Sequence, residues 1–159
     1  MDEMISNNKE LLSLIEEWEP KLLSLSEDII SGRRNSQNRT IRQIVGHMVD
    51  SASNNTHRIV HLQYRESPLD FPNYASNGNN NRWIAIQNYQ EEDWFTLVQV
   101  WKYSNFHIMH VIENADRSKL ANHWHYSETK LISLEEGIID YLRHFKLHLD
   151  EIDEILSAV

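Results

Sequence analysis

The sequence predicts an all-α protein, a four-helix bundle formed by a single domain over residues 1–159. The chain contains only 4 Gly and 3 Pro, and few such residues mean few tight turns, which favours long helices over many short strands. Four segments also carry apolar residues at the spacing of an amphipathic helix. A chain of 159 residues is a usual size for one compact domain with its own core.

The first two helices are separated by a polar connection. The first is predicted over residues 6–30 and capped by Ser6, with a kink or break near Glu19 because Pro20 lacks the N–H of an internal helical residue. The second is predicted over residues 41–65, where the preceding threonine is a suitable N-cap. Apolar residues recur on one broad face of each segment, which indicates two amphipathic helices packed on a common core.

A long irregular connection follows the second helix, over residues 66–89. It contains Pro68, Pro72, Gly78 and a run of asparagines, and it has room for a short helix over residues 82–88. Connections of this length are uncommon in compact domains and generally carry function or cross the molecule. Such a crossover allows the second and third helices to run parallel, as in some four-helix bundles.

The third and fourth helices are predicted over residues 91–113 and 134–157. The third begins with three acidic residues, which stabilise the positive end of the helix macrodipole. Residues 123–126, between the two helices, could be extended. Ser133, with Glu136 three residues later, forms the capping-box pattern that opens a helix.

The composition excludes several classes of function. Lys and Arg total 15 against 24 Asp and Glu, and the resulting net charge of −9 disfavours nucleic acid as a partner. No apolar run approaches the roughly 18 residues that span a bilayer, so no membrane partner is expected. A chain without cysteine has no thiol nucleophile, disulfide or zinc ribbon. The first residues do not resemble a secretory signal, so a cytoplasmic location is expected.

Nine histidines are the compositional surplus of the chain. His144 and His148 lie about 40° apart around the fourth helix, so their imidazoles can chelate one divalent ion. His57 and His61 form a second pair with the same spacing on the second helix. The first pair borders the apolar stripe that contains Phe145, whereas the second lies on a flank where a solvated role is more natural. The spacing alone also fits two half-buried, hydrogen-bonded imidazoles at 144 and 148.

A mononuclear catalytic metal site generally takes three protein ligands and leaves one position open. His47, early in the second helix and at the border of its apolar face, is the strongest candidate for the third ligand. Asp50, one turn later on nearly the same side, could accept the second ring N–H of a ligand histidine or act as a base towards bound water. The alternative for Asp50 is a solvated surface carboxylate.

The five tryptophans divide between helices and connections. Three follow helical spacing and are expected in the core or at its edge, namely Trp18, Trp94 and Trp101. The other two lie in predicted connections, where packing is the simplest role, namely Trp83 and Trp124. These two could also wall a pocket above a metal site, alongside Tyr74, His125 and Tyr126.

Two segments of the chain resemble those of a known family. Residues 40–51 resemble the second helix of the DinB/YfiT-like superfamily, and residues 132–152 resemble its last helix. The resemblance implies a DinB-like four-helix bundle with a long connection between helices 2 and 3. It also implies that His47, His144 and His148 bind one divalent metal ion, because the family uses one histidine of the second helix and an H-x-x-x-H pair of the fourth.

A divalent ion held by three neutral imidazoles keeps its full charge and is a strong Lewis acid, which lowers the pKa of a bound water or thiol. Zinc or nickel is expected, and manganese is chemically tolerable. The resemblance implies an enzyme, either a thiol S-transferase that uses a low-molecular-weight thiol such as bacillithiol, or a hydrolase in which Asp50 is the base. It favours the transferase. The alternative is a non-catalytic metal- or ligand-binding stress-response protein.

The expected partners are a small-molecule substrate and a second copy of the chain. Apolar residues on the first and third helices could continue into a partner, and the resemblance implies a homodimer.

Overall fold

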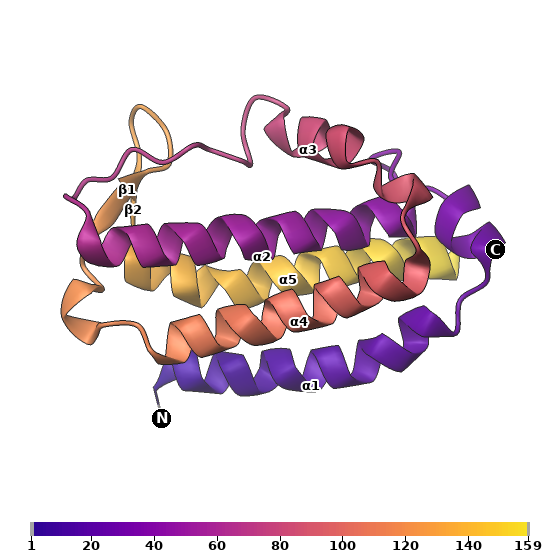
Figure 1. The fold of residues 1–159 in the computed structure, drawn as a ribbon, viewed down its shortest axis with the longest axis horizontal. Helices are drawn as coiled ribbons and strands as arrows, with labels where there is room; N and C mark the ends of the chain where they lie inside the picture. The colour runs from indigo at the N-terminus through magenta and orange to yellow at the C-terminus, as the bar shows by residue number, and fades with distance from the viewer. Residues whose placement is uncertain (1, 159) are drawn as a thin grey trace.

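Four long helices form the bundle in the computed structural model, which describes residues 2–158 (Figure 1). Their bounds are Glu3–Leu23 for α1, Ile41–Tyr64 for α2, Trp94–Glu113 for α4 and Leu134–Ser157 for α5. Helix α2 packs against α4 and α5, and α1 packs against the same two helices. Figure 1 shows α2 and α4 running in one direction and α1 and α5 in the other. The prediction of an all-α bundle with parallel second and third long helices is therefore confirmed.

The connection between α2 and α4 crosses the outside of α2 (Figure 1). It contains α3, Asn79–Gln87, and a 3₁₀ turn, Tyr89–Glu91. The predicted short helix exists but begins three residues earlier than expected, directly after Gly78, whose φ of 73° is readily adopted only without a side chain. An extended segment and a short helix of the crossover thus lie over one face of α2 (Figure 1).

A short antiparallel hairpin, β1 His123–His125 with β2 Leu131–Ser133, lies between α4 and α5. It follows a 3₁₀ turn, Arg117–Lys119, and β1 lies within the segment predicted to be extended. Leu69 of the crossover pairs in parallel with Trp124, and its N–H donates to the His123 carbonyl at 2.8 Å. This pairing fastens the start of the crossover to the hairpin.

The first helix differs from its prediction at both ends. It begins at Glu3 because the Asp2 side chain accepts from the Met4 N–H at 3.0 Å, so the prediction that Ser6 is the N-cap is wrong. The helix also continues through Pro20 and ends at Leu23, followed by a separate π-helical turn at Asp28–Gly32. Pro20 removes one backbone bond within the last turn, and that turn is stabilised by the packing of the fully buried Leu22 side chain.

The other long helices begin at strong caps. Thr40 with Gln43, and Ser133 with Glu136, form complete capping boxes at the starts of α2 and α5. Helix α4 begins three residues later than predicted, after the N-cap Asp93, because the preceding residues form the 3₁₀ turn.

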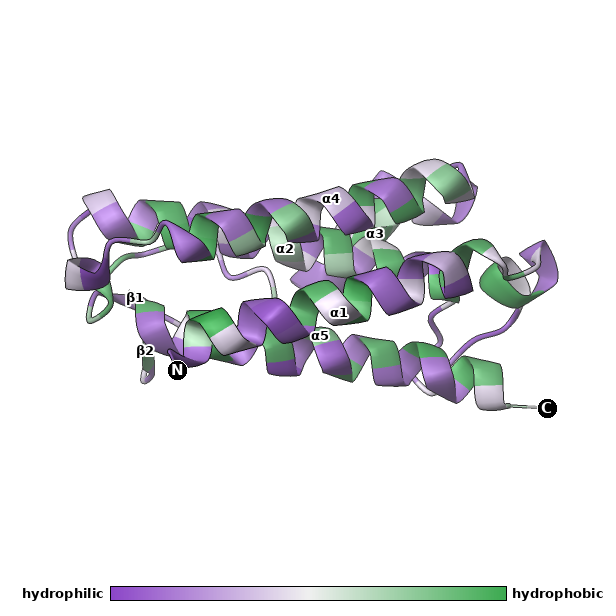
Figure 2. Ribbon diagram, turned by 90° about the horizontal axis from the view of Figure 1, so that it is seen from below, coloured by the Kyte–Doolittle hydropathy of each residue, from purple (hydrophilic) through white to green (hydrophobic). Residues whose placement is uncertain are grey.

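The core is one continuous cluster of buried apolar side chains from all four long helices. Figure 2 shows each helix with alternating hydrophilic and hydrophobic segments along its length, as expected for amphipathic helices around a shared core. Trp18 and Trp101 are buried in it, as predicted, and Trp94 packs at its edge. Within residues 2–158, no helix has both the length and the apolar character needed to cross a membrane.

Candidate metal centre

Three histidines distant in sequence lie together where α2 packs on α5. The ring centroid of His148 lies 4.5 Å from that of His47 and 4.7 Å from that of His144, and both pairs are edge to face. His47 and His148 are each 4% exposed, and His144 is partly buried. The fold therefore brings the three predicted ligands together at one buried place.

His148 is held by a carboxylate on its own helix. Its Nδ1 lies 2.8 Å from an oxygen of Glu151, one turn later, and both side chains are largely buried. The other ring nitrogen, Nε2, is buried and has no hydrogen-bond partner among the described residues. A histidine that donates Nδ1–H to a carboxylate keeps its Nε2 lone pair free, which is the usual arrangement of a metal ligand.

His47 is also contacted by the crossover. The buried hydroxyl of Tyr74 lies 2.5 Å from His47 Nδ1, and the Trp83 ring of α3 packs edge-on against Tyr74 with centroids 5.3 Å apart. Tyr74 and Trp83, two of the residues considered as walls of a pocket, thus lie beside His47, and whether they wall a pocket stays a prediction. Trp124 and Tyr126 instead pack on each other in and beside the hairpin.

Burial keeps the imidazoles of His47 and His144 uncharged. It is the main reason that the pKa of His47 falls to about 2, and the neighbouring His148 and Arg39 lower it further. Burial also lowers the pKa of His144 to about 4, again with His148 as the next cause. Since metal ions bind the neutral form of imidazole, both rings are in the ligating form at neutral pH.

Asp50 is a buried carboxylate, 2% exposed, so the surface interpretation is wrong. One oxygen, Oδ1, accepts from the Tyr89 hydroxyl at 2.5 Å and from the Gln87 amide at 2.8 Å. The other, Oδ2, is buried and has no partner among residues 2–158. Burial raises the pKa of Asp50 to about 6, against the lowering effect of its bonds to Tyr89 and Gln87. A carboxyl with this pKa can exchange a proton near neutral pH.

The Tyr89 ring packs directly against Gly46 of α2, and its hydroxyl bonds Asp50 one turn later. A Cβ built on Gly46 would lie 2.2 Å from a carbon of the Tyr89 ring, a distance that no packed side chain tolerates. Gly46 is therefore the position that lets the 3₁₀ turn approach α2 closely. A glycine within a predicted helix was the available sequence signal for this contact.

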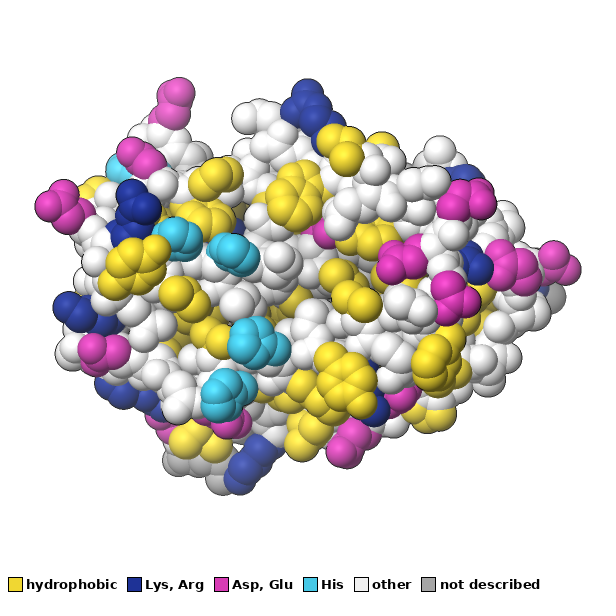
Figure 3. Space-filling view, viewed as in Figure 1, with side chains coloured by type: hydrophobic (Ala, Val, Ile, Leu, Met, Phe, Trp, Pro, Cys, Tyr) yellow, Lys and Arg dark blue, Asp and Glu magenta, His cyan; other side chains and the backbone are white. Residues whose placement is uncertain are grey.

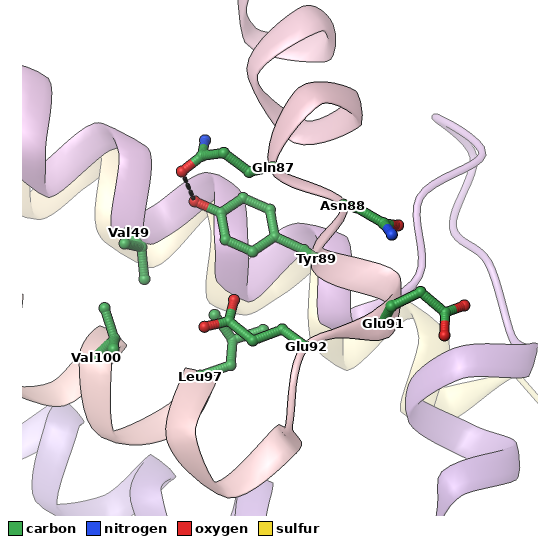
Figure 4. A pocket seen from close by; sticks show the side chains of 8 residues that line it. All are labelled: Val49, Gln87, Asn88, Tyr89, Glu91, Glu92, Leu97 and Val100. Atoms are coloured by element: carbon green, nitrogen blue, oxygen red, sulfur yellow. Dashed lines mark hydrogen bonds between the residues drawn. The ribbon is translucent and has the colours of Figure 1, made fainter.

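An open pocket of about 480 Å³ lies on the outer side of the Asp50 network (Figure 4). Gln87 and Tyr89, which bond Asp50, line it together with Glu92 and Leu97. Figure 4 shows the Tyr89 hydroxyl turned to Gln87, and the two side-chain oxygens are 2.9 Å apart. None of the three histidines lines this pocket.

The second histidine pair lies outside the centre. His57 is exposed, and His61 bonds the Tyr64 hydroxyl through Nδ1 at 2.9 Å. Figure 3 shows histidine side chains at the surface over α2 and α4. This agrees with the solvated role expected for the pair.

The donor set fits a divalent ion, although the rings would have to turn to bind one. Within residues 2–158, no group of three or more His, Asp or Glu side chains already stands in position to hold a metal. With Zn–N distances of about 2.0–2.1 Å, ligand rings around one ion have centroids roughly 5 Å apart, similar to the two separations found here. The unpartnered Nε2 of His148 and the Glu151 carboxylate, which lies 2.8 Å from the other ring nitrogen of His148, also fit a metal ligand.

The fold is similar to two solved structures. One is YfiT from Bacillus subtilis, described as a probable metal-dependent hydrolase with an unusual four-helix bundle topology. The two structures match with a TM-score of 0.76 and 17% sequence identity, and the match covers 94% of this chain and 86% of YfiT. The other is a histidine-to-alanine mutant of the mycothiol-dependent maleylpyruvate isomerase, with a TM-score of 0.74 and 11% identity over 94% of this chain. This chain spans only 60% of the isomerase. No family model matches the sequence, and no curated protein matches it.

These likenesses define the class of fold. The chain has a four-helix bundle fold similar to that of YfiT, with a long connection between its second and third long helices.

Proposed function

We propose that this chain is a metal-dependent enzyme in which His47, His144 and His148 hold one divalent ion. The observation that carries the proposal is the packing of the His47 and His144 rings against His148, whose buried Nε2 has no partner among the described residues. The fold neighbour YfiT, a probable metal-dependent hydrolase, supports metal-dependent chemistry, and the other neighbour, a mycothiol-dependent isomerase, supports the use of a thiol.

The hydrogen bonds of the centre suit ligation through Nε2. Glu151 accepts the Nδ1 proton of His148 and so fixes the tautomer that ligates. In the same tautomer His47 donates Nδ1–H to the Tyr74 oxygen, and the Tyr74 hydroxyl hydrogen is free to turn towards the His47 carbonyl, 3.5 Å away. Two of the three ligands thus have an acceptor for the ring proton that metal binding requires.

Zinc or nickel suits three imidazoles best, and manganese is a further candidate. When bound, the ion supplies Lewis acidity that lowers the pKa of a coordinated thiol or water. Proton transfer and the positioning of the base are assigned to residues of the chain. Asp50 would be the proton acceptor of the site, and Gln87 and Tyr89 hold its carboxylate in place through their bonds to Oδ1. The reaction proposed first is transfer of a low-molecular-weight thiol onto a small electrophile, and the second is hydrolysis of an amide or ester.

Metal content tests the centre. Freshly purified wild-type protein is expected to contain about one equivalent of zinc or nickel by elemental analysis, and His47→Ala, His144→Ala and His148→Ala are each expected to lose most of it. The matched controls are His57→Ala and His61→Ala, which change the pair outside the centre and should keep the wild-type metal content. Equal metal in all five variants contradicts the three-histidine site.

Two assays then separate the reactions. The metal-loaded protein is incubated with a thiol and a model electrophile, and separately with an amide and an ester, with His148→Ala as the control in each. Thiol consumption that His148→Ala abolishes supports the transferase, and product from the amide or ester supports the hydrolase. Stoichiometric metal without turnover in any assay contradicts the enzyme and favours a non-catalytic metal- or ligand-binding protein.

A further inference from the structure

A second set of unpartnered buried groups lies farther along α2, at Arg58. The guanidinium carbon of Arg58 lies 3.8 Å from the centroid of the Trp124 ring, and the Phe71 ring of the crossover lies 5.8 Å away. One terminal nitrogen donates to the Asn55 amide oxygen at 2.9 Å. The Nε is buried and has no acceptor in the part of the chain that the structure describes.

Arg58 also has no counter-ion among the described residues. The chain carries a net charge of −9, and its acidic side chains pair with several other cations. Three such arginine pairs are Arg42–Glu27, Arg117–Asp2 and Arg143–Asp140, and no ion pair includes Arg58. Burial lowers the pKa of Arg58 to about 10, so the guanidinium remains charged at neutral pH. A largely buried charge without a partner is costly unless something else satisfies it.

Trp124 supplies a second unpartnered donor at the same place. Its side chain is buried beneath Arg58, and its Nε1 has no acceptor among residues 2–158. The indole N–H can only donate a hydrogen bond, and a guanidinium can only donate. The missing partner of both groups is therefore an acceptor, and the positive charge of Arg58 favours an anionic one.

We propose that Arg58 and Trp124 form an oxyanion site, which binds the carboxylate or phosphate group of a small molecule. Stacking on Trp124 fixes the plane of the guanidinium and leaves its N–H edge for the ligand. A planar fork of N–H donors matches the oxygens of a carboxylate or phosphate, and such charge-assisted bonds are about twice as strong as neutral ones.

This site lies on the same side of α2 as the candidate metal centre. Arg58 follows His47 by 11 residues, which is three turns, about 16 Å along the axis and about 20° around it. The crossover links the two places, since Phe71 packs near Arg58 and Tyr74 bonds His47. An acidic small molecule could therefore lie along α2 between them. That this molecule is the substrate of the histidine centre rests on the proposed function, whereas anion binding by Arg58 does not.

The test measures anion binding to metal-free protein from which the chelator has been removed by gel filtration. The midpoint of thermal unfolding is followed against inorganic phosphate and against malonate, with ionic strength held constant by potassium chloride. Wild-type protein is expected to show a saturable rise in midpoint with at least one of the two anions, and the tighter one identifies the chemistry of the ligand. Arg58→Met should lose the response. Arg58→Lys and Trp124→Phe should bind about tenfold or more weakly, because each loses part of the donor set.

Arg143→Met is the matched control, since Arg143 is exposed and paired with Asp140 on α5, and its anion response should equal that of the wild type. A wild-type midpoint that chloride alone reproduces overturns the proposal. So does an unchanged response in Arg58→Met, which would make the stack on Trp124 purely structural. Trp124→Phe decides the outcome if Arg58→Met does not fold. His148→Ala should lose metal but keep the anion response, so the two proposals fail separately.

Discussion

Asp50 is the residue whose chemistry folding changes most clearly. In the folded protein its carboxylate is buried, and only one of its two oxygens has a hydrogen-bond partner among the described residues. Burial raises its pKa from 3.8 to about 6. Because the folded state then holds this proton more tightly than the unfolded chain, the ionised carboxylate destabilises the fold above pH 6, and this cost disappears as the pH falls towards 4.

The substitution Asp50→Asn removes this charge. In metal-free protein we expect the variant to gain stability over the wild type between pH 4 and pH 8, by on the order of 3 kcal/mol, since a unit of pKa shift is worth about 1.4 kcal/mol and the shift is about two units. Urea unfolding at several pH values measures the difference. Asp150→Asn, at an exposed position of α5, is the control and should show no such trend. A difference between Asp50→Asn and wild type that does not vary with pH would contradict the buried, titrating carboxylate.

Residue spacing could predict the three histidines but not most of their partners. The four-residue separation of His144 and His148 alone places them on one helix face. The contact of Glu151 with His148 could be predicted in the same way, because Glu151 lies one turn beyond His148. Tyr74 and Tyr89 come from the connection before α4. The path of an irregular connection depends on tertiary contacts that no local periodicity records, so their contacts with His47 and Asp50 could not be predicted.

At the scale of elements, the Tyr89 turn approaches α2 very closely at Gly46. Gly46→Ala places a methyl group within 2.2–2.6 Å of three ring carbons of Tyr89. The ring cannot move aside cheaply, because its hydroxyl is bonded to Asp50. We expect the substitution to destabilise the protein by about 1–3 kcal/mol, the usual cost of overpacking, measured by urea unfolding at pH 7.

Gly137→Ala is the matched control, because a Cβ at this position of α5 meets nothing within 4 Å. It should stabilise the protein by about 0.5–1 kcal/mol, since alanine is the better helix former. The double variant Gly46→Ala/Tyr89→Ala should lose less than the sum of the two single changes. Additive losses would show that the cost at Gly46 does not come from the Tyr89 ring.

Helix starts were predictable wherever a side chain caps them in a recognisable pattern. The capping boxes of Thr40 and Ser133 set the starts of α2 and α5 at the predicted residues. The α1 start was misplaced because Asp2 competes with Ser6 as a cap, and tertiary packing of Leu22 outweighs the local effect of Pro20. Local signals therefore decide boundaries only where packing does not oppose them.

At the scale of the whole molecule, the crossover determines where chemistry can occur. It lets α2 and α4 run parallel and brings Tyr74, Trp83, Gln87 and Tyr89 to the α2 side of the bundle (Figure 1). The unpartnered atoms of Asp50, Arg58 and His148 lie on or beside α2 as well. Helices α1 and α4, which pack together opposite the pair α2 and α5, contribute none of these residues and are available for another role.

That role is the interface of the homodimer that we propose. The most exposed large apolar side chains of helix α4 are Phe95 at 61% and Tyr103 at 58%, about 80° apart around its axis. The neighbouring α1 exposes part of Ile5 and Leu12. Apolar side chains exposed on two adjacent helices are the feature on which this proposal rests.

Light scattering after size exclusion tests this interface. Wild-type protein at tens of micromolar is expected to have twice the mass of the chain, and Phe95→Glu/Tyr103→Glu is expected to have the mass of one chain, because two carboxylates would be buried without partners at the interface. The circular dichroism spectrum should not change, since both side chains are exposed in the single chain. Ile86→Glu is the control, because Ile86 is the most exposed apolar residue of α3, away from α1 and α4, and it should leave the dimer intact. A wild type with the mass of one chain contradicts the homodimer, and a dimer that survives the double variant places its interface elsewhere.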